Sequence, residues 1–163
     1  MSHPYIVHTI DLLEDKKKIY IVQELIKDGN LMETFERIAD NDMPFTERDA
    51  ANLVQRLLRG LAYIHESGYL HRDIKLENIM VTERQVDGRT VFTPEFTDFG
   101  MASMIKKDER LDLPVGTPLY MAPELLEHQP YDKKVDIWAL GVTIYIMLLS
   151  EPPFAANSPH QLL

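Results

Sequence analysis

The chain opens with a strand-like pattern of apolar residues and then changes to a helical one. Residues 19–23 read Ile-Tyr-Ile-Val-Gln, a short β-branched and aromatic run, and the polar residues 14–18 separate this run from Ile6 and Val7. This pattern predicts two antiparallel strands joined by a solvated turn. After the Asp-Gly pair at residues 28–29, the spacing of apolar residues becomes that of a helix.

The clearest helix signal begins at Thr46. Apolar residues then recur at spacings of three and four, which places them on one helix face. They are Ala50, Leu53, Val54, Leu57, Leu58, Leu61 and Ile64. Thr46 with Asp49 predicts a capping box at the start of this helix, and Gly68 predicts its carboxy-terminal cap.

A second long helix is predicted near the end of the sequence. Residues 137–149 form the longest apolar run, 13 positions, whereas a membrane span needs about 20. The run therefore predicts a buried helix from about Lys134 to Leu149. Because it is apolar all round, this helix needs neighbours on every side, and without them it would expose an apolar patch.

The middle of the chain combines turns, short strands and a long loop. Residues 86–89, Val-Asp-Gly-Arg, predict a hairpin turn before a strand from Thr90 to Thr97. Residues 98–123 show weak periodicity, and loops longer than about 12–15 residues in a compact domain are usually functional. A short helix is expected after Pro123. This order of elements predicts an α+β fold with a mainly helical body.

Composition narrows the class of protein. The 163 residues are 45% hydrophobic and 26% charged, which is typical of one globular domain. The net charge of −9 argues against nucleic acid as the main partner, because phosphate binding needs a basic face. The absence of cysteine excludes disulfides, thiolate zinc sites and a cysteine nucleophile. It also suits a reducing compartment, so we expect a cytoplasmic protein and leave the nucleus open. No secretory segment and no membrane partner are expected.

Three motifs follow one another along the chain. Residues 71–78 read His-Arg-Asp-Ile-Lys-Leu-Glu-Asn, residues 98–100 read Asp-Phe-Gly, and residues 116–124 read Gly-Thr-Pro-Leu-Tyr-Met-Ala-Pro-Glu. One such motif could arise by chance, but the ordered set could not. The chain resembles the eukaryotic protein kinase catalytic domain of the serine/threonine type. Residues 141–149 and 152–154 make it most similar to the calcium/calmodulin-dependent group.

The resemblance implies an enzyme that transfers the γ-phosphate of ATP to Ser or Thr hydroxyls of protein substrates with the help of Mg²⁺. By this resemblance, Asp73 is the base that orients the substrate hydroxyl, Lys75 neutralises charge on the transferred phosphate, and Thr117 bonds to both. Asp98 and Asn78 supply oxygen ligands for Mg²⁺, and Asn78 thereby belongs to the catalytic set.

The resemblance also implies a set of ATP-binding residues. Residues 23–26 look like the hinge, with Gln23 as gatekeeper. The carbonyl of Glu24 and the amide of Ile26 would then read the adenine, with Met80 beneath the ring. The full set is Gln23, Glu24, Ile26, Asn30, Glu77, Asn78, Met80 and Asp98.

Three further positions bear on the protein substrate. Glu77 falls where relatives that prefer basic substrates bind an arginine three residues before the phosphoacceptor. Asn30 stands in place of an acidic residue and weakens this preference, and Ile146 indicates that no second arginine is read. We therefore expect a substrate with one basic residue three positions before the phosphoacceptor, and the oligomeric state stays open.

Residues 98–124 correspond to the activation segment of the family. Where many relatives carry an activating phosphothreonine, this sequence has Leu113. Arg72 would pair with that phosphate, and Asp112 or Glu109 are the acidic residues that could replace it. We therefore expect activity that needs no phosphorylation of this segment.

The implied fold is the two-lobed protein kinase fold, α+β and present in part. Residues 1–28 would be a remnant of the small lobe with two strands and the hinge. Residues 29–163 would be an incomplete, mainly helical large lobe. Asp136, at the start of the central helix, is expected to anchor the backbone of residues 71–78, which correspond to the catalytic loop of the family.

Two functional interpretations stay open. The seven glycines are nowhere closer than eight positions, so the sequence has no glycine-rich phosphate loop, and the family's ATP-positioning lysine is also missing. The chain is then either part of a serine/threonine kinase truncated at both ends or a catalytically inactive kinase-like binding module. The intact set of Asp73, Lys75, Asn78 and Asp98 favours the kinase, because a binding module has no chemical need of all four.

Overall fold

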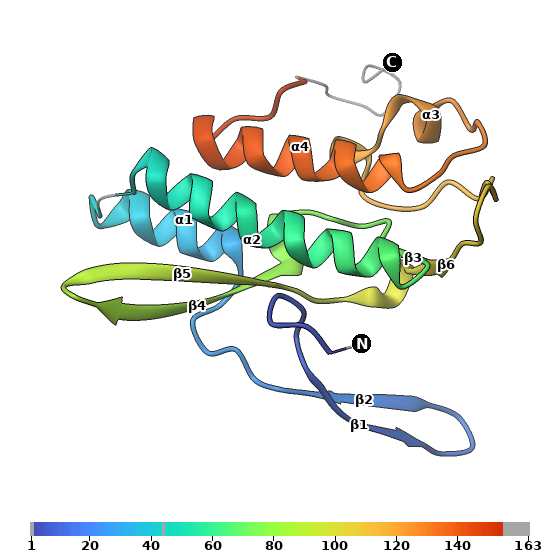
Figure 1. The fold of residues 1–163 in the computed structure, drawn as a ribbon, viewed down its shortest axis with the longest axis horizontal. Helices are drawn as coiled ribbons and strands as arrows, with labels where there is room; N and C mark the ends of the chain where they lie inside the picture. Colours follow the sequence, from blue (N-terminus) through green and yellow to red (C-terminus); the bar gives the residue numbers. More distant parts are fainter. Residues whose placement is uncertain (1, 44, 155–163) are drawn as a thin grey trace. The chain divides into compact units, whose positions relative to one another are not determined.

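The computed structural model describes residues 2–43 and 45–154, and its elements confirm an α+β fold (Figure 1). In chain order the helices and strands are β1 Thr9–Glu14, β2 Ile19–Gln23, α1 Leu31–Asp40, α2 Glu47–Glu66, β3 Tyr69–Leu70, β4 Ile79–Val86, β5 Arg89–Phe96, β6 Ser103–Met104, α3 Pro123–Leu126 and α4 Lys134–Leu149. Short 3-10 turns cover Leu76–Asn78, Phe99–Met101 and Pro118–Tyr120.

Residue contacts divide the chain into two compact units. The first unit contains the chain up to Gly60 together with Ile79–Thr97, and the second contains Leu61–Asn78 and the chain from Asp98 onward. The division follows spatial contacts, so each unit is built from two separate stretches. It does not test the lobe boundary after residue 28, which stays a prediction.

The β4–β5 hairpin of the first unit is fixed by its turn. Val86 pairs with Arg89, and the two residues between them, Asp87 and Gly88, have φ of 49° and 74°. Two consecutive left-handed residues match the twist of a tight hairpin, and Asp-Gly is a preferred pair for them. The predicted turn is confirmed, and the strand after it runs one residue earlier than predicted, Arg89–Phe96.

The partner of β2 was predicted at the wrong place. The prediction used Ile6 and Val7, whereas β2 pairs antiparallel with β1, Thr9–Glu14. Ile6 instead forms a parallel bridge with Phe96, and the Val7 N–H donates to the Phe96 carbonyl at 2.9 Å. Ile6 and Val7 are each 5% exposed, so they pack against β5 rather than pair with β2.

Helices α1 and α2 begin at side-chain caps. Asn30 Oδ1 accepts the Glu33 N–H at 3.0 Å, and the Glu33 carboxylate accepts the Asn30 N–H at 3.0 Å. Thr46 and Asp49 make the same reciprocal arrangement at α2, which confirms the predicted capping box. Gly68 has φ of 81°, as its predicted capping role requires. The apolar stripe of α2 is confirmed as buried or half-buried except at Leu58, which is 48% exposed.

Helix α4 has the predicted bounds but is packed on one face only. Its buried apolar residues are Val135, Ala139, Leu140, Val142 and Met147. Its exposed ones are Ile137, Trp138, Tyr145, Leu148 and Leu149. Within the described residues, neighbours therefore do not surround this helix. The apolar patch that was expected in their absence is exposed. No helix in the described ranges is long and apolar enough to cross a bilayer.

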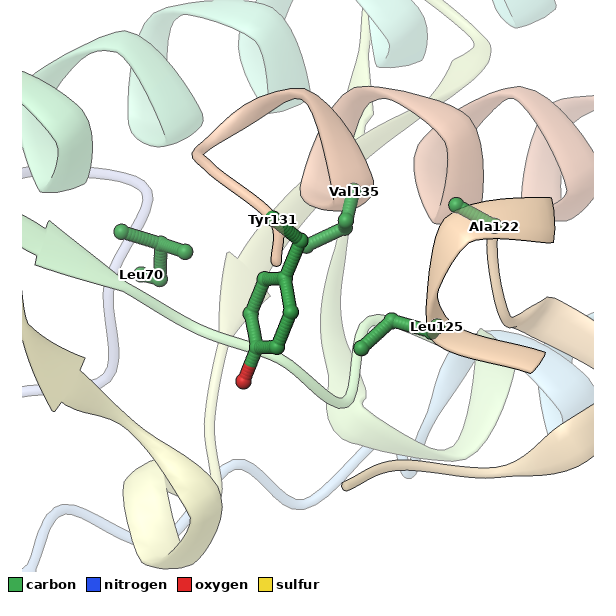
Figure 2. Packing of buried hydrophobic residues seen from close by; sticks show 5 residues of the cluster. All are labelled: Leu70, Ala122, Leu125, Tyr131 and Val135. Atoms are coloured by element: carbon green, nitrogen blue, oxygen red, sulfur yellow. The ribbon is translucent and has the colours of Figure 1, made fainter. Parts of the chain in front are cut away.

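The amino end of α4 packs into an apolar cluster of the second unit. Figure 2 shows its five residues, with the ring of Tyr131 lying among the aliphatic side chains and the hydroxyl oxygen extending from it. The cluster consists of Leu70, Ala122, Leu125, Tyr131 and Val135. It joins β3, α3 and α4, so it ties the strand before the catalytic loop to the helix that follows the activation segment.

Two helical glycines make a matched test of packing. A Cβ on Gly60 would lie 3.1 Å from the buried Phe96 ring and 3.1 Å from the Tyr5 carbonyl oxygen, whereas a Cβ on Gly141 would have no neighbour within 4 Å. We expect Gly60→Ala to lower the free energy of unfolding by about 1–2 kcal/mol through overpacking. Gly141→Ala should raise it by about 0.5–1 kcal/mol, because alanine is the better helix former. Urea unfolding measures both, and equal effects of the two variants would contradict the packing argument.

Candidate functional site

The loop at residues 71–78 is anchored from α4 by one buried carboxylate. Asp136, 1% exposed, accepts the N–H groups of His71 at 2.9 Å and Arg72 at 2.8 Å. His65 Nε2 is also within hydrogen-bond distance of this carboxylate, at 2.8 Å. The expected anchoring role of Asp136 is confirmed. His65 was not predicted, because nothing in its position on α2 indicates a partner 71 residues away.

Asp73, Lys75 and Thr117 form a closed cluster. Thr117 Oγ1 donates to Asp73 Oδ1 at 2.7 Å, and Lys75 Nζ donates to Thr117 Oγ1 at 2.9 Å. Lys75 Nζ also lies 3.0 Å from Asp73 Oδ2. The structure thus brings together three residues that lie up to 44 positions apart in the sequence, with the contacts that were predicted for Thr117.

These contacts determine the charge of the Asp73 carboxyl. Partial burial raises its pKa, but hydrogen bonds from Thr117, Lys75 and Asn78, with the positive charge of Lys75, outweigh the burial. The net result is a pKa below the ordinary value of 3.8. Asp73 is therefore a carboxylate at neutral pH, able to accept a hydrogen bond from a hydroxyl group.

Asn78 is oriented by the same carboxylate. Its Nδ2 donates to the Asp73 carbonyl and to Asp73 Oδ2, each at 2.9 Å, and the side chain is 7% exposed. Both of these hydrogen bonds use the amide nitrogen, so Oδ1 is the atom that can bind a metal ion. The 3-10 turn Leu76–Asn78 sets this orientation through the Asn78 N–H, which donates to the Lys75 carbonyl at 3.1 Å.

Asp98 stands in a left-handed backbone conformation, with φ of 56° and ψ of 72°. Its Oδ1 accepts the Gly100 N–H at 3.2 Å, and the residue is exposed. Arg72 is also left-handed, with φ of 68°. Such conformations are unfavourable for residues other than glycine, and they concentrate at functional sites. Among the described residues, Asp98 has no hydrogen bond to Asp73 or Asn78.

Asn78 and Asp98 fit Mg²⁺ in kind. Each has a side-chain oxygen that makes no hydrogen bond within the described residues, and hard oxygen atoms are the ligands that Mg²⁺ prefers. Elsewhere in the described ranges, no group of three His, Asp or Glu side chains could hold a metal ion. Mg²⁺ commonly takes only one or two protein ligands, with phosphates and water completing its shell.

The activation segment passes tightly over the catalytic loop. A Cβ on Gly116 would lie 2.6 Å from the Arg72 carbonyl oxygen, and the φ of Gly116 is 120°, so only glycine fits there. Four residues later, Tyr120 is buried in the turn Pro118–Tyr120. Burial, reinforced by the charge of Glu77, raises the pKa of Tyr120 to about 12, so its hydroxyl stays neutral.

The acidic partners predicted for Arg72 were wrong. Arg72 Nε donates to the Met101 carbonyl at 2.6 Å, and its Nη1 donates to the Tyr131 hydroxyl at 3.1 Å. Neither Asp112 nor Glu109 forms an ion pair with it. Sequence reasoning missed Tyr131, because this residue lies in a loop with no periodicity, and the only signal would have been a tyrosine hydroxyl at a buried position.

The predicted hinge residues lie in the first unit. Gln23 ends β2, and the Glu24 N–H donates to the His8 carbonyl at 3.0 Å. Asn30 and Met80 form an isolated antiparallel bridge, so the structure places their backbones side by side. Asn30 Oδ1 is occupied as the cap of α1, which is a structural role the sequence did not predict. The adenine contacts that were predicted for Glu24 and Ile26 stay predictions.

The other predicted ATP-binding residues lie in the second unit. They are Glu77, Asn78 and Asp98. Glu77 is exposed, so its carboxylate is available to a cationic group. The second unit therefore contains a carboxylate next to a lysine and a threonine, two oxygen ligands for a metal ion, and an anchored loop that carries most of them. This arrangement suits a phosphoryl-transfer enzyme, which needs positioned charges more than covalent chemistry.

Comparison with known proteins gives the family. Residues 1–162 match the family model described as the protein kinase domain. The chain is 39% identical over 168 residues to serine/threonine-protein kinase 33 of Bos taurus. It is 41% identical over 162 residues to calcium/calmodulin-dependent protein kinase type 1B of Homo sapiens, and 36% identical to a probable myosin light chain kinase of Dictyostelium discoideum. The chain belongs to the protein kinase family, and its relatives are serine/threonine kinases.

The matches cover 99% of this chain but only part of each relative. The chain spans 33% of the length of kinase 33 and 45% of the length of the type 1B kinase. The resemblance to serine/threonine kinases, the calcium/calmodulin-dependent group included, is confirmed, and so is a kinase fold that is present in part.

Removing the charge of Asp136 should loosen the catalytic loop. The Asp136 carboxylate accepts hydrogen bonds from three donors, and in Asp136→Asn an uncharged amide faces the same three donors. We expect the free energy of unfolding to fall by about 3 kcal/mol. Urea unfolding and amide hydrogen exchange at His71 and Arg72 measure the loss. Asp112→Asn, at an exposed carboxylate, is the control and should change stability by less than about 0.5 kcal/mol. An Asp136→Asn variant as stable as this control would refute the anchor.

Glu95, which lies beside Glu24, should make the first unit less stable at neutral pH. Burial, followed by the charge of Glu24, raises the pKa of Glu95 above its ordinary value of 4.5. The unfolded chain therefore ionises first as the pH rises, and folding is penalised above pH 4.5. Glu95→Gln should raise the unfolding free energy at pH 7 but not at pH 4. The exposed Glu36→Gln should show no such difference, and a gain independent of pH would contradict the proposed cause.

Proposed function

We propose that the protein is an ATP-dependent serine/threonine kinase whose protein substrates are aligned by Asp73. The observation that carries this proposal is the 2.7 Å hydrogen bond from Thr117 Oγ1 to Asp73 Oδ1. An aliphatic hydroxyl already donates to this carboxylate, which is the contact that a substrate Ser or Thr would make. The family membership supports the same reaction class.

Asp73 acts mainly by orienting the acceptor hydroxyl. Its depressed pKa makes it a weak base, so early removal of the proton is unfavourable. A carboxylate that accepts the hydroxyl proton can still align the oxygen lone pair with the phosphorus atom. The proton then passes to Asp73 as the new P–O bond forms.

Lys75 supplies positive charge at the reacting group. Its ammonium lies 3.0 Å from Asp73 Oδ2 and is held by Thr117, so it is positioned before substrate arrives. Negative charge on the transferred phosphoryl oxygens is stabilised by a cation fixed in this way, at no cost of reorganisation. The lysine also keeps the pKa of Asp73 low, which links the two roles.

Asn78 Oδ1 and the Asp98 carboxylate would hold Mg²⁺, which when bound neutralises charge on the ATP phosphates. The ordering of Asn78 by Asp73 ties the metal ligand to the substrate-orienting group. By the family resemblance, Gln23, Glu24, Ile26 and Met80 would form the adenine site, and Asn30 and Glu77 are the further members of the ATP-binding set.

Two properties of the whole protein complete the proposal. The exposed Glu77 would bind a basic residue three positions before the phosphoacceptor through a charge-assisted hydrogen bond. The absence of cysteine suits a reducing compartment, which would be the cytoplasm. The 163 residues contain no glycine-rich loop, so a catalytically inactive binding module remains the second candidate function.

The native protein should phosphorylate a peptide with arginine three residues before serine in the presence of ATP and Mg²⁺. Asp73→Asn should lower kcat by about 10²–10⁴-fold while ATP binding is retained. Asp98→Ala should abolish the Mg²⁺ dependence of ATP binding along with transfer. Glu66→Gln, at an exposed carboxylate of the same unit, serves as the control and should keep full activity.

The outcomes separate the two candidate functions. Transfer that persists in Asp73→Asn would refute the assignment of Asp73. A native protein that binds partners but transfers no phosphate, with or without these substitutions, would favour the binding module.

A further inference from the structure

Tyr131 attaches the activation segment to the rest of the second unit. The backbone N–H and carbonyl of Tyr131 exchange hydrogen bonds with those of Leu111, at 2.8 and 3.0 Å. The Tyr131 hydroxyl donates to the Leu113 carbonyl at 2.7 Å. One residue outside the segment therefore fixes two of its positions, and its side chain is 1% exposed within the apolar cluster of Figure 2.

The same hydroxyl receives a hydrogen bond from the catalytic loop. Arg72 Nη1 donates to it at 3.1 Å, so both the lone pair and the proton of the phenol are used. Arg72 Nε donates to the Met101 carbonyl at 2.6 Å, near the other end of the segment. In the described residues the guanidinium forms no ion pair, and its directed contacts are these two neutral oxygens.

The segment itself offers no free hydroxyl that could take over this task. Between residues 98 and 124, the hydroxyl-bearing residues are Ser103, Thr117 and Tyr120. Thr117 is bound to Asp73 and Lys75, and Tyr120 is 5% exposed. Ser103 lies in β6, next to the residue that pairs with Tyr69. A phosphate on Thr117 would break its contacts with Asp73 and Lys75, and a phosphate on Tyr120 would have to leave a buried position.

The position of Leu113 controls where Thr117 can lie. Only three residues separate them, and a Cβ on one of these, Gly116, would lie 2.6 Å from the Arg72 carbonyl oxygen. Holding the Leu113 carbonyl therefore limits the reach of the chain to the point where Thr117 Oγ1 meets Asp73. A released Leu113 would let Thr117 move away from the carboxylate that it helps to keep ionised.

We propose that Tyr131 is a positioning residue whose hydroxyl joins Arg72 to Leu113 and holds the activation segment in its working position without phosphorylation. The catalytic part of this inference rests on the proposed kinase function. The holding part does not, because it concerns the hydrogen bonds of the segment alone.

Limited trypsin digestion of the native protein tests the holding part directly. Lys106, Lys107 and Arg110 are exposed cleavage sites within the segment. Tyr131→Phe removes the hydroxyl and keeps the ring in its cluster. Loss of a hydrogen bond of ordinary strength should raise cleavage at these three sites about fivefold to tenfold. Arg72→Met removes the other partner and should also raise cleavage at these sites. It takes the place of Tyr131→Phe as the test if that variant is unstable.

Tyr145→Phe is the matched control, because Tyr145 lies on the exposed face of α4 and has no hydrogen bond in the described residues. It should leave cleavage unchanged. In the kinase assay, Tyr131→Phe should lower kcat several-fold and leave the KM for ATP unchanged. A merely structural loss would instead lower the thermal unfolding temperature with no selective increase at the three segment sites.

Each outcome decides the inference. Cleavage of Tyr131→Phe at the rate of Tyr145→Phe would overturn it. So would phosphatase treatment of the wild-type protein that exposes the segment to trypsin. A protein without kinase activity, in which Tyr131→Phe still opens the segment, would refute the proposed function and leave the holding role of Tyr131 standing.

Discussion

The buried carboxylate of Asp136 is the interaction on which the candidate site depends. A carboxylate with 1% exposure is costly unless donors replace its water, and the His71 N–H, the Arg72 N–H and the His65 ring do so. These donors belong to two different segments, so α4 fixes both the end of α2 and the start of the catalytic loop. Asp73 follows immediately after the fixed backbone, which leaves it little freedom.

From this anchor, two connections lead to the activation segment. Asp73 binds Thr117, and Arg72 reaches the Met101 carbonyl and the Tyr131 hydroxyl. The catalytic loop is therefore bonded to both ends of the segment. The left-handed backbone of Arg72 is part of the same arrangement, because it turns the carbonyl toward Gly116 while the side chain reaches Tyr131.

Local patterns predicted much of the fold. The bounds of α4, the capping box at Thr46 and the turn at Asp87-Gly88 depend on neighbouring residues, and all three were found where the sequence indicated. The position of β1 was not predicted, because Ile6 and Val7 have strand-like side chains but pair with Phe96, 90 positions away. Spacing within a short window carries no information about such a partner.

The candidate site shows the same division. The motifs indicated Asp73, Lys75, Asn78, Asp98 and Thr117, and in the structure Lys75, Asn78 and Thr117 each contact Asp73. The partner of Arg72 was predicted as acidic from charge alone, whereas the structure uses a phenol and a carbonyl. A neutral acceptor leaves no charge pattern in the sequence, so only the three-dimensional contacts reveal it. Asn30 was likewise assigned to the ATP-binding set from its position after the predicted hinge, whereas its side chain caps α1.

The uncharged nature of the Tyr131 contact has a consequence for control. An ion pair between a guanidinium and a phosphate weakens with salt and can be removed by an enzyme, whereas a hydrogen bond from a buried phenol to a carbonyl is screened little by ions and is always present. A segment held in this way needs no phosphate to stay in place. Control of such a protein would then act through its abundance, its partners or parts of the molecule other than this segment.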